Sequence, residues 1–344
     1  MTGSNGFFGN QLTIKFIKEG HTVLFLTDNS EWYKKAIDSL QQSSEINNDL
    51  IKNFQLIECS DMKNLVELKN CLHNLDVDEI WQVLAHMSYD FEALPESVRF
   101  NSVVSTNIMK FINSCKRYYF ISTTGVAGIG EGNTPKFVKE ELLTDFNSLN
   151  PYTASKVLAE YMLWNQSIEN DINLTIIRPG SIIGDSITGF SNGTKFGYYS
   201  YLYPLKKFQN KKMTFYLNVD PAKRFPVIHI NHLVDMCCSL HNRDDNKSEK
   251  REVFHACNTN LFTAEEHFHI FEEISNGNLK IGYGEGETGF NKVYNKMNAD
   301  NNRFMAVNCE YDNTKLINAI GIDAIPPRLT IEGISKVIET YMHS

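Results

Sequence analysis

Residues 2–9 read Thr-Gly-Ser-Asn-Gly-Phe-Phe-Gly, and this stretch decides the fold through the placement of its glycines. Gly3, Gly6 and Gly9 have the spacing G-x-x-G-x-x-G, and a helical pattern over residues 10–19 follows. Glycines at this spacing let the backbone turn tightly and approach a pyrophosphate, which the N-terminus of the next helix attracts. The stretch therefore predicts a dinucleotide-binding loop, although such a spacing alone also occurs in ordinary turns.

The β-strand that normally precedes this loop is missing from the sequence. Only Met1 and Thr2 stand before Gly3, whereas the strand at this point is usually central to the sheet. Its loss would leave the edges of the neighbouring strands unpaired. We therefore expect a truncated first strand rather than a redesigned sheet.

Short β-rich runs alternate with helical patterns after the loop. The expected strands cover residues 21–27, 53–58, 79–85, 118–122 and 174–177. The expected helices cover residues 10–19, a segment through 32–37 capped by Ser30, 62–75, about 95–116, a segment opened by Asn150 and Pro151, and 331–342. Near-continuous apolar strands between helices indicate an α/β fold with a doubly wound, Rossmann-like parallel sheet. Such sheets bind ligands at the carboxyl ends of their strands.

A smaller substrate-binding lobe is expected to interleave with this sheet, because the alternating pattern weakens after Arg178. We assign residues 1–185 and about 226–257 to the dinucleotide-binding domain, and residues 186–225 and 258–344 to the lobe. Aromatic side chains of the lobe are candidates to line an apolar pocket, although core packing or an oligomer contact is their commoner use. They are Phe190, Phe196, Tyr198, Tyr199, Tyr201 and Tyr203.

A Tyr-x-x-x-Lys pair lies near the start of the helix that Asn150 opens. The spacing places the Tyr152 phenol and the Lys156 ammonium on one helical face. A nearby ammonium lowers a tyrosine pKa, so the phenol can exchange a proton near neutral pH. Such pairs also occur by chance on solvated helices. Here, however, the hydroxyls of residues 122–124 follow a strand and reach the edge at which these folds bind ligands.

At these residues the chain resembles the extended short-chain dehydrogenase/reductase family, over roughly residues 1–260. Residues 2–9 are similar to the family's TGxxGFxG loop, and Val126 and Gly128 align with the end of its serine/threonine segment. The resemblance implies the catalytic group Thr123, Tyr152 and Lys156, with Thr123 preferred to Ser122 or Thr124. The expected cofactor contacts are Gly3, Asn5, Gly6, Phe7, Phe8, Gly9, Asp28, Asp61, Met62, Ala85, Tyr152, Lys156, Pro179 and Ser181.

Two segments resemble the thioester reductase and fatty acyl reductase branch of that family. They are residues 121–128 and residues 178–189, which read RPGSIIGDSITG. This implies hydride transfer from the nicotinamide to a carbonyl or acyl-thioester carbon. Tyr152 would protonate the oxyanion, Thr123 would hydrogen-bond to it, and Lys156 would hold the nicotinamide ribose.

Two other functions stay open. A nucleotide-sugar epimerase or dehydratase with bound NAD would use the same three residues, and residues 228–234 (IHINHLV) are similar to the family's IHVDDLV segment. A non-catalytic dinucleotide-binding protein is the other alternative, because Asn231 replaces the usual aspartate and fold alone does not establish activity.

Asp28 predicts NAD rather than NADP as the cofactor. It follows the strand over residues 21–27, where an acidic side chain usually accepts hydrogen bonds from the adenosine ribose and repels a 2′-phosphate. Thioester reductases usually place an arginine here, so the chain departs from that branch. Lys34 and Lys35 are evidence against NAD, since both lie within reach of a phosphate, and Asp28 also suits a helix-capping turn.

Composition excludes several other classes of protein. A net charge of −8 is the opposite of the basic composition that is typical of nucleic-acid-binding proteins. No apolar run approaches the length of a membrane span. The seven cysteines form no C-x-x-C, and the H-x-x-H and H-x-H pairs have no third ligand cluster nearby. We therefore expect no metal, reduced thiols, a cytoplasmic location, a small-molecule or acyl-thioester substrate and, by default, a homodimer.

Overall fold

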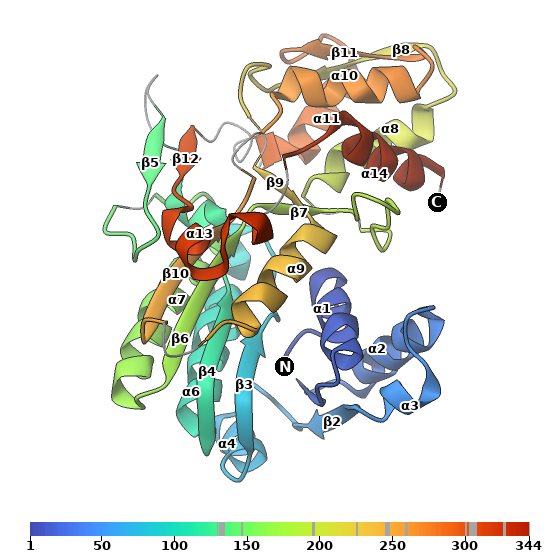
Figure 1. Cartoon of the computed structure of the whole chain (residues 1–344). Coiled ribbons are helices and arrows are strands. Elements are labelled where there is room, and N and C mark those ends of the chain that lie inside the picture. The colour runs from blue at the N-terminus through green and yellow to red at the C-terminus, as the bar shows by residue number, and fades with distance from the viewer. Residues whose placement is uncertain are drawn as a thin grey trace.

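A parallel sheet with helices on both faces makes up the larger part of the protein (Figure 1). The computed structural model describes the chain except residues 129, 131–134, 146, 195–196, 225, 245–247, 259–260, 300, 303–307, 326–327 and 344. Four strands pair in the order β10 (Arg251–Ala256), β6 (Asn173–Pro179), β4 (Ser114–Ile121) and β3 (Asp76–Gln82). A second parallel pair consists of β1 (Val23–Thr27) and β2 (Phe54–Glu58). The predicted α/β fold with a parallel sheet is confirmed.

Met1 and Thr2 lie between β1 and β3, where a central strand is expected in this type of sheet. The amide of Leu26 donates to the carbonyl of Met1 at 2.9 Å, and the amide of Thr2 donates to the carbonyl of Trp81 at 3.0 Å. Thr2 also forms a parallel bridge with Gln82. Residues 1–2 therefore link the two sets of strands, and the glycine loop begins directly at the carboxyl ends of those strands.

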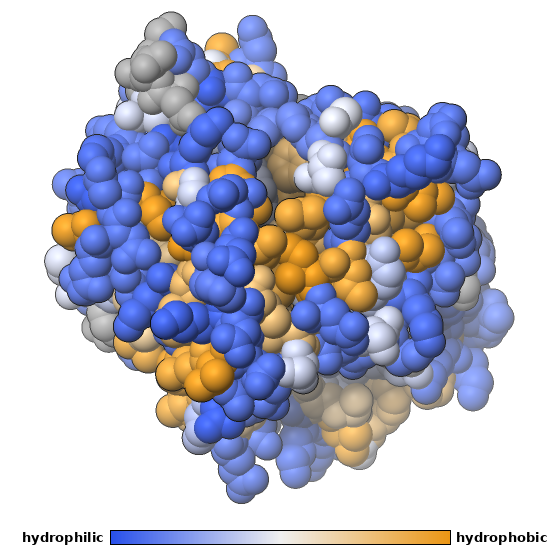
Figure 2. All heavy atoms as spheres, turned by 90° about the horizontal axis from the view of Figure 1, so that it is seen from below, coloured by the Kyte–Doolittle hydropathy of each residue, from blue (hydrophilic) through white to orange (hydrophobic). Residues whose placement is uncertain are grey.

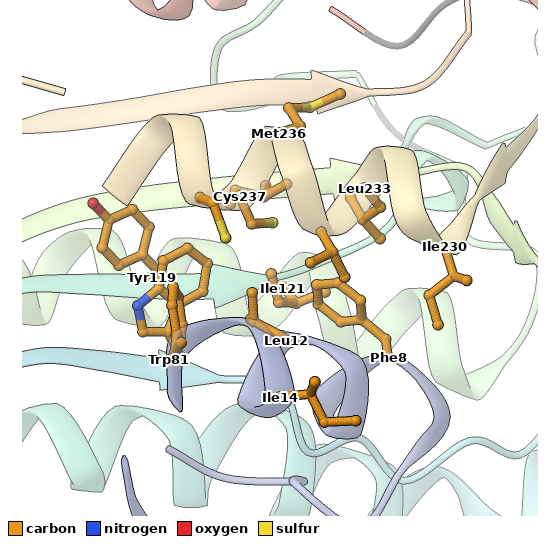
Figure 3. Close-up of a cluster of buried hydrophobic side chains, with 14 of the residues drawn as sticks. Phe8, Leu12, Ile14, Trp81, Tyr119, Ile121, Ile230, Leu233, Met236 and Cys237 are labelled. Atoms are coloured by element: carbon orange, nitrogen blue, oxygen red, sulfur yellow. The ribbon is translucent and has the colours of Figure 1, made fainter. Parts of the chain in front are cut away.

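Helices cover the two faces of the sheet with separate apolar clusters. On one face α1 (Phe7–Lys18) packs against α9 (Ile230–His241) over Trp81 and Tyr119, whose rings stack with centroids 3.9 Å apart (Figure 3). The second cluster joins the sheet to three helices on the other face. These are α4 (Leu65–Leu72), α6 (Ser105–Phe111) and α7 (Pro151–Glu169).

Other elements connect and flank these layers. They are α2 (Ser30–Gln42), α3 (Asn48–Ile51), a 3-10 turn at Phe91–Ala93, α5 (Leu94–Val98), a π-helix at Arg99–Val104, a 3-10 turn at Thr124–Ala127, β5 (Lys136–Val138), β12 (Cys309–Tyr311), α13 (Thr314–Ile320) and a 3-10 turn at Ile322–Ala324. α13 packs on α9 and β10, and its Leu316 belongs to the cluster beneath α1.

A smaller lobe lies above the carboxyl ends of the strands (Figure 1). The pair β7 (Ser181–Ile183) and β9 (Val227–His229) leads into it. Its own apolar cluster includes Tyr199, Phe215 and Phe268. The remaining elements of the lobe are α8 (Tyr199–Phe208), β8 (Met213–Leu217), α10 (Ala264–Ile274), β11 (Leu279–Tyr283), α11 (Gly289–Met297) and α14 (Ile331–His343).

Some predicted boundaries are wrong. β3 ends at Gln82, so Ala85 lies beyond the strand, and the helix expected up to residue 116 stops at Phe111 because β4 begins at Ser114. The side chain that caps α2 is Asn29, not Ser30, and it accepts hydrogen bonds from two first-turn amides.

Apolar side chains also reach one face of the molecule. Seen from below, they gather at the centre of that face, with hydrophilic side chains around them (Figure 2). Within the described residues, none of the helices combines the length and apolarity needed to cross a membrane.

Candidate active site

The glycine loop packs so closely that two of its glycine positions have no room for a side chain. Gly3 has φ +72°, and a Cβ on it would lie 2.8 Å from the amide nitrogen of Leu84. A Cβ on Gly9 would lie 2.1 Å from the carbonyl oxygen of Gly3. α1 begins directly after Gly6. Because glycine has no side chain to accept hydrogen bonds from the first-turn amides, these amides stay available to a ligand. This cradle fits a dinucleotide pyrophosphate, which binds bare backbone at a helix N-terminus.

Gly9→Ala is expected to destabilise the protein by about 1–3 kcal/mol, because the added methyl group must displace the backbone at Gly3. The same displacement should weaken cofactor binding. Thermal melting and titration with NADH measure the two effects. Gly289→Ala is the matched control, since a Cβ there meets nothing within 4 Å. A Gly9→Ala variant that binds NADH like the parent would contradict the placement of the pyrophosphate.

α7 carries two of the expected catalytic side chains and starts at a well-defined cap. The side chain of Asn150 accepts from the Thr153 amide at 3.0 Å, and Pro151 occupies the first turn, where its missing N–H costs nothing. Lys156 Nζ donates to the carbonyl of Ile121 at 2.7 Å and lies 5.9 Å from the centre of the Tyr152 ring. The predicted shared face of Tyr152 and Lys156 is present.

Burial controls the ionisation of both groups. It lowers the pKa of Lys156 to about 7, against the opposing effect of the charge on Glu160. Burial also raises the pKa of Tyr152, and the nearby Tyr89 adds to that rise. In the protein without ligand the phenol is therefore protonated at neutral pH, as a proton donor must be.

Three hydroxyls follow β4, and their environments differ. Thr123 lines the cavity described below, and its Oγ1 accepts from the Gly125 amide at 3.1 Å, which leaves its own hydrogen to donate. Ser122 donates to Glu160 at 2.6 Å. Thr124 is fully buried and does not line that cavity. The geometry favours Thr123 as the hydroxyl that contacts a substrate oxygen.

A cavity of about 490 Å³ joins the glycine loop to these side chains. It lies at the carboxyl ends of the strands, as expected for this sheet. The residues of the sequence prediction that line it are Gly3, Asn5, Gly6, Phe7, Phe8, Gly9, Ala85, Thr123, Tyr152, Lys156, Pro179 and Ser181.

Three predicted cofactor residues do not line this cavity: Asp28, Asp61 and Met62. Asp28 accepts a hydrogen bond from the amide of Met62 at 3.3 Å, so the ends of β1 and β2 are tied together at this point. Asp61 accepts from the amide of Lys63 in a turn, and the side chain of Met62 is buried in the core. The roles of Asp28, Asp61 and Met62 toward a cofactor stay predictions.

The family model of the NAD-dependent epimerase/dehydratase family matches residues 1–256. The chain belongs to this family. The family's NAD dependence agrees with the expectation drawn from the glycine loop and Asp28. No curated protein matches the chain in sequence.

Solved structures of very different sequence share the fold of this family member. UDP-glucuronic acid 4-epimerase from Bacillus cereus, in complex with NAD and a fluorinated UDP-sugar, has a TM-score of 0.70 at 16% identity and covers 99% of this chain and 98% of its own. UDP-glucose 4-epimerase from Thermotoga maritima has a TM-score of 0.69 at 15% identity, over 99% and 97%. The terminal R domain of the myxalamid PKS-NRPS biosynthetic pathway has a TM-score of 0.74 at 16% identity, over 99% and 89%.

Several side chains around the cavity of this family member were missed from the sequence. They include Trp32, Met87, Tyr89, Asn150, Ile182 and Thr194. Tyr198 and Tyr199 were expected as pocket aromatics and do line the cavity, whereas Phe190, Tyr201 and Tyr203 do not. Phe196 lies outside the described residues. A signal existed only for Met87 and Tyr89, which follow the carboxyl end of β3 where ligands of such sheets bind.

The paired histidines serve structural contacts. His229 Nδ1 lies 2.7 Å from the carbonyl of Gly184, and His267 Nε2 lies 2.5 Å from the hydroxyl of Tyr198. In the part of the chain that the structure describes, no group of three or more potential ligands is arranged to hold a metal ion.

Proposed function

We propose that the protein is an NAD-dependent reductase of a carbonyl or acyl-thioester substrate, with Tyr152 as the proton donor. The character of the cavity wall carries this proposal. Lys156 is the only charged side chain among the described residues that line the cavity. Met87, Tyr198 and Tyr199 also line the cavity. Such a wall suits an acyl or other apolar group better than a sugar diphosphate, which needs cationic partners.

The reaction follows from the contacts of three side chains. The bound dinucleotide would supply the hydride, with its pyrophosphate at the glycine loop and its nicotinamide ribose at Lys156. Thr123 donates to the substrate oxygen and holds it beside Tyr152. Tyr152 transfers its proton to that oxygen as negative charge develops there. The apolar wall keeps water away from the reacting carbon.

A nucleotide-sugar epimerase is the second candidate. It is supported by the family, whose description covers epimerases and dehydratases, and by the same group Thr123, Tyr152 and Lys156, which serves reversible oxidation of a sugar hydroxyl equally well. In this reading NAD stays bound and returns its hydride to the same substrate.

One pair of assays separates the two candidates. The first follows loss of NADH with aldehydes, acyl-CoA thioesters of several chain lengths and carrier-bound thioesters. The second follows interconversion of UDP- and GDP-sugars without net cofactor use. We expect NADH consumption in the first assay. Sugar interconversion without it would replace the reductase with an epimerase, and no turnover in either assay by a folded protein that binds NADH would favour a non-catalytic protein.

Asp28 is expected to give a ten- to several-hundred-fold preference for NADH over NADPH in kcat/KM. Two unit charges about 4 Å apart repel by roughly 1 kcal/mol in water and about 4 kcal/mol at an effective dielectric constant of 20. Asp28→Ala should reduce the preference for NADH. The control is Asp38→Ala, at an exposed residue of α2, which should leave this preference unchanged. A parent enzyme that prefers NADPH would overturn this assignment.

A further inference from the structure

Glu160 is a buried carboxylate on the same face of α7 as Tyr152 and Lys156. The three residues follow one another at intervals of four, so their side chains stack along the helix. Glu160 is only 2% exposed. A buried carboxylate is costly unless it is paired, and the identity of its partners therefore shows what it holds in place.

The carboxylate joins the ends of two strands to α7. Its Oε1 accepts from Ser122 Oγ at 2.6 Å and from Arg178 Nε at 2.9 Å, and its Oε2 accepts from Arg178 Nη2 at 2.6 Å. The two bonds from Arg178 form a bidentate fork, which fixes orientation as well as distance. Ser122 immediately precedes Thr123, and Arg178 immediately precedes Pro179 at the cavity wall. One side chain thus sets the relative positions of three segments that meet at the site.

On the side away from Glu160, Arg178 contacts a neutral group. Arg178 Nη1 lies 3.3 Å from His255 Nε2, while His255 Nδ1 lies 2.8 Å from the carbonyl of Asp312. Because a carbonyl only accepts, Nδ1 carries the hydrogen and Nε2 accepts from the guanidinium. Burial, and then the charge of Arg178, lower the pKa of His255 to about 3, so this ring stays neutral.

The charge of Glu160 also acts on Lys156, one turn away. Burial lowers the pKa of Lys156, and Glu160 is the group that opposes this. The other groups around Lys156 are Tyr152 on its own helix, Tyr89 beyond that phenol, and Arg178 of β6, which reaches the same carboxylate. Phenols carry no charge near neutral pH, and Arg178 adds a positive one. The negative charge that favours the Lys156 ammonium therefore comes from Glu160.

We propose that Glu160 is the positioning residue of the site: it ties the helix of Tyr152 and Lys156 to the ends of β4 and β6, and it places a carboxylate one helical turn from the Lys156 ammonium. The inference rests on the proposed contact of Lys156 with the cofactor. It does not depend on whether the substrate is a thioester, an aldehyde or a sugar.

The test compares Glu160→Gln with Glu252→Gln in the full chain. Glu252 is a matched control because it is also a buried carboxylate bound by arginines, Arg117 of β4 and Arg243 just after α9, but it does not line the cavity. NADH binding is titrated between about pH 5 and pH 9, and melting is recorded for each variant. Both substitutions should lower the melting temperature. NADH affinity should fall as pH rises through the pKa of Lys156. Only Glu160→Gln should move this fall, by about one to two pH units toward lower pH, because the Lys156 ammonium then loses its proton at a lower pH.

A second variant distinguishes the loss of the carboxylate charge from a general disruption of the structure. Glu160→Asp keeps the carboxylate and should keep the parent pH dependence, even if the Ser122 contact weakens. If Glu160→Gln does not fold, the double variant Glu160→Gln with Arg178→Gln leaves no unpaired buried charge. Because it removes one negative and one positive charge, its pH dependence should shift less than that of Glu160→Gln, whereas its NADH affinity should still fall because the link between α7, β4 and β6 is lost. Parental pH dependence in the folded Glu160→Gln protein, or an equal shift in Glu252→Gln, would overturn the proposal. Because the readout is NADH binding, a failed reductase assay does not affect it.

Discussion

Tyr152→Phe is expected to lower kcat by about 10²–10⁴-fold, the usual contribution of a positioned general acid. The substitution removes one oxygen and leaves the ring that packs in the cavity. The rest of the pocket, including Lys156 and the glycine loop, keeps its contacts. NADH affinity should therefore stay close to that of the parent, so that the loss appears in turnover and not in binding.

Tyr161→Phe provides the control for this result. Tyr161 lies on the same helix, but its hydroxyl donates to the backbone carbonyl of Leu143 outside the cavity. Its loss should change stability slightly and leave kcat nearly unchanged. Steady-state kinetics and NADH titration on both variants give the comparison. A Tyr152→Phe enzyme with near-parental turnover would remove Tyr152 from the mechanism, whatever the substrate.

Local signals made the helix of the site predictable. The cap at Asn150, the proline after it and the spacing of Tyr152 and Lys156 all act within one or two turns, and α7 begins where they indicate. The glycine loop is equally local, since Gly9 packs against the backbone of Gly3 only six residues away. These features determine the type of fold and the face of the helix that meets a ligand.

Boundaries and partners that depend on distant residues were not predictable. The helical pattern continues past Phe111 into a segment that pairs with β3 instead, and only the strand partner decides this. The bond between Asp28 and Met62 and the clamp of Glu160 on Arg178 each join separate elements.

The choice among the three hydroxyls after β4 shows the same limit. Motif alignment alone singled out Thr123 from its neighbours, without a physical reason. The structure favours the same residue, because the Ser122 hydroxyl donates to Glu160 and Thr124 does not line the cavity, and the role of Thr123 stays a prediction.

Lys156→Met is expected to weaken NADH binding by about 10- to 100-fold and to lower kcat/KM by roughly 10²–10⁴-fold. A hydrogen bond from a charged group contributes about 1.5–3 kcal/mol, which covers the binding loss. The remainder comes from proton transfer, since methionine fills the space of the lysine stem without its charge.

The pH dependence of the rate in the Lys156→Met variant tests the role of this lysine. Tyr152 must be protonated to act as an acid, so the rate falls as pH rises through its pKa. That limb lies at high pH, because burial raises the pKa of Tyr152. Burial lowers the pKa of Lys156 to about 7, so any fall in rate that follows the deprotonation of Lys156 near pH 7 should disappear in the variant. Lys139 lies outside the cavity, and Lys139→Met serves as the control that should change neither measurement. Unchanged NADH affinity together with an unchanged profile in Lys156→Met would mean that this lysine does not face the cofactor.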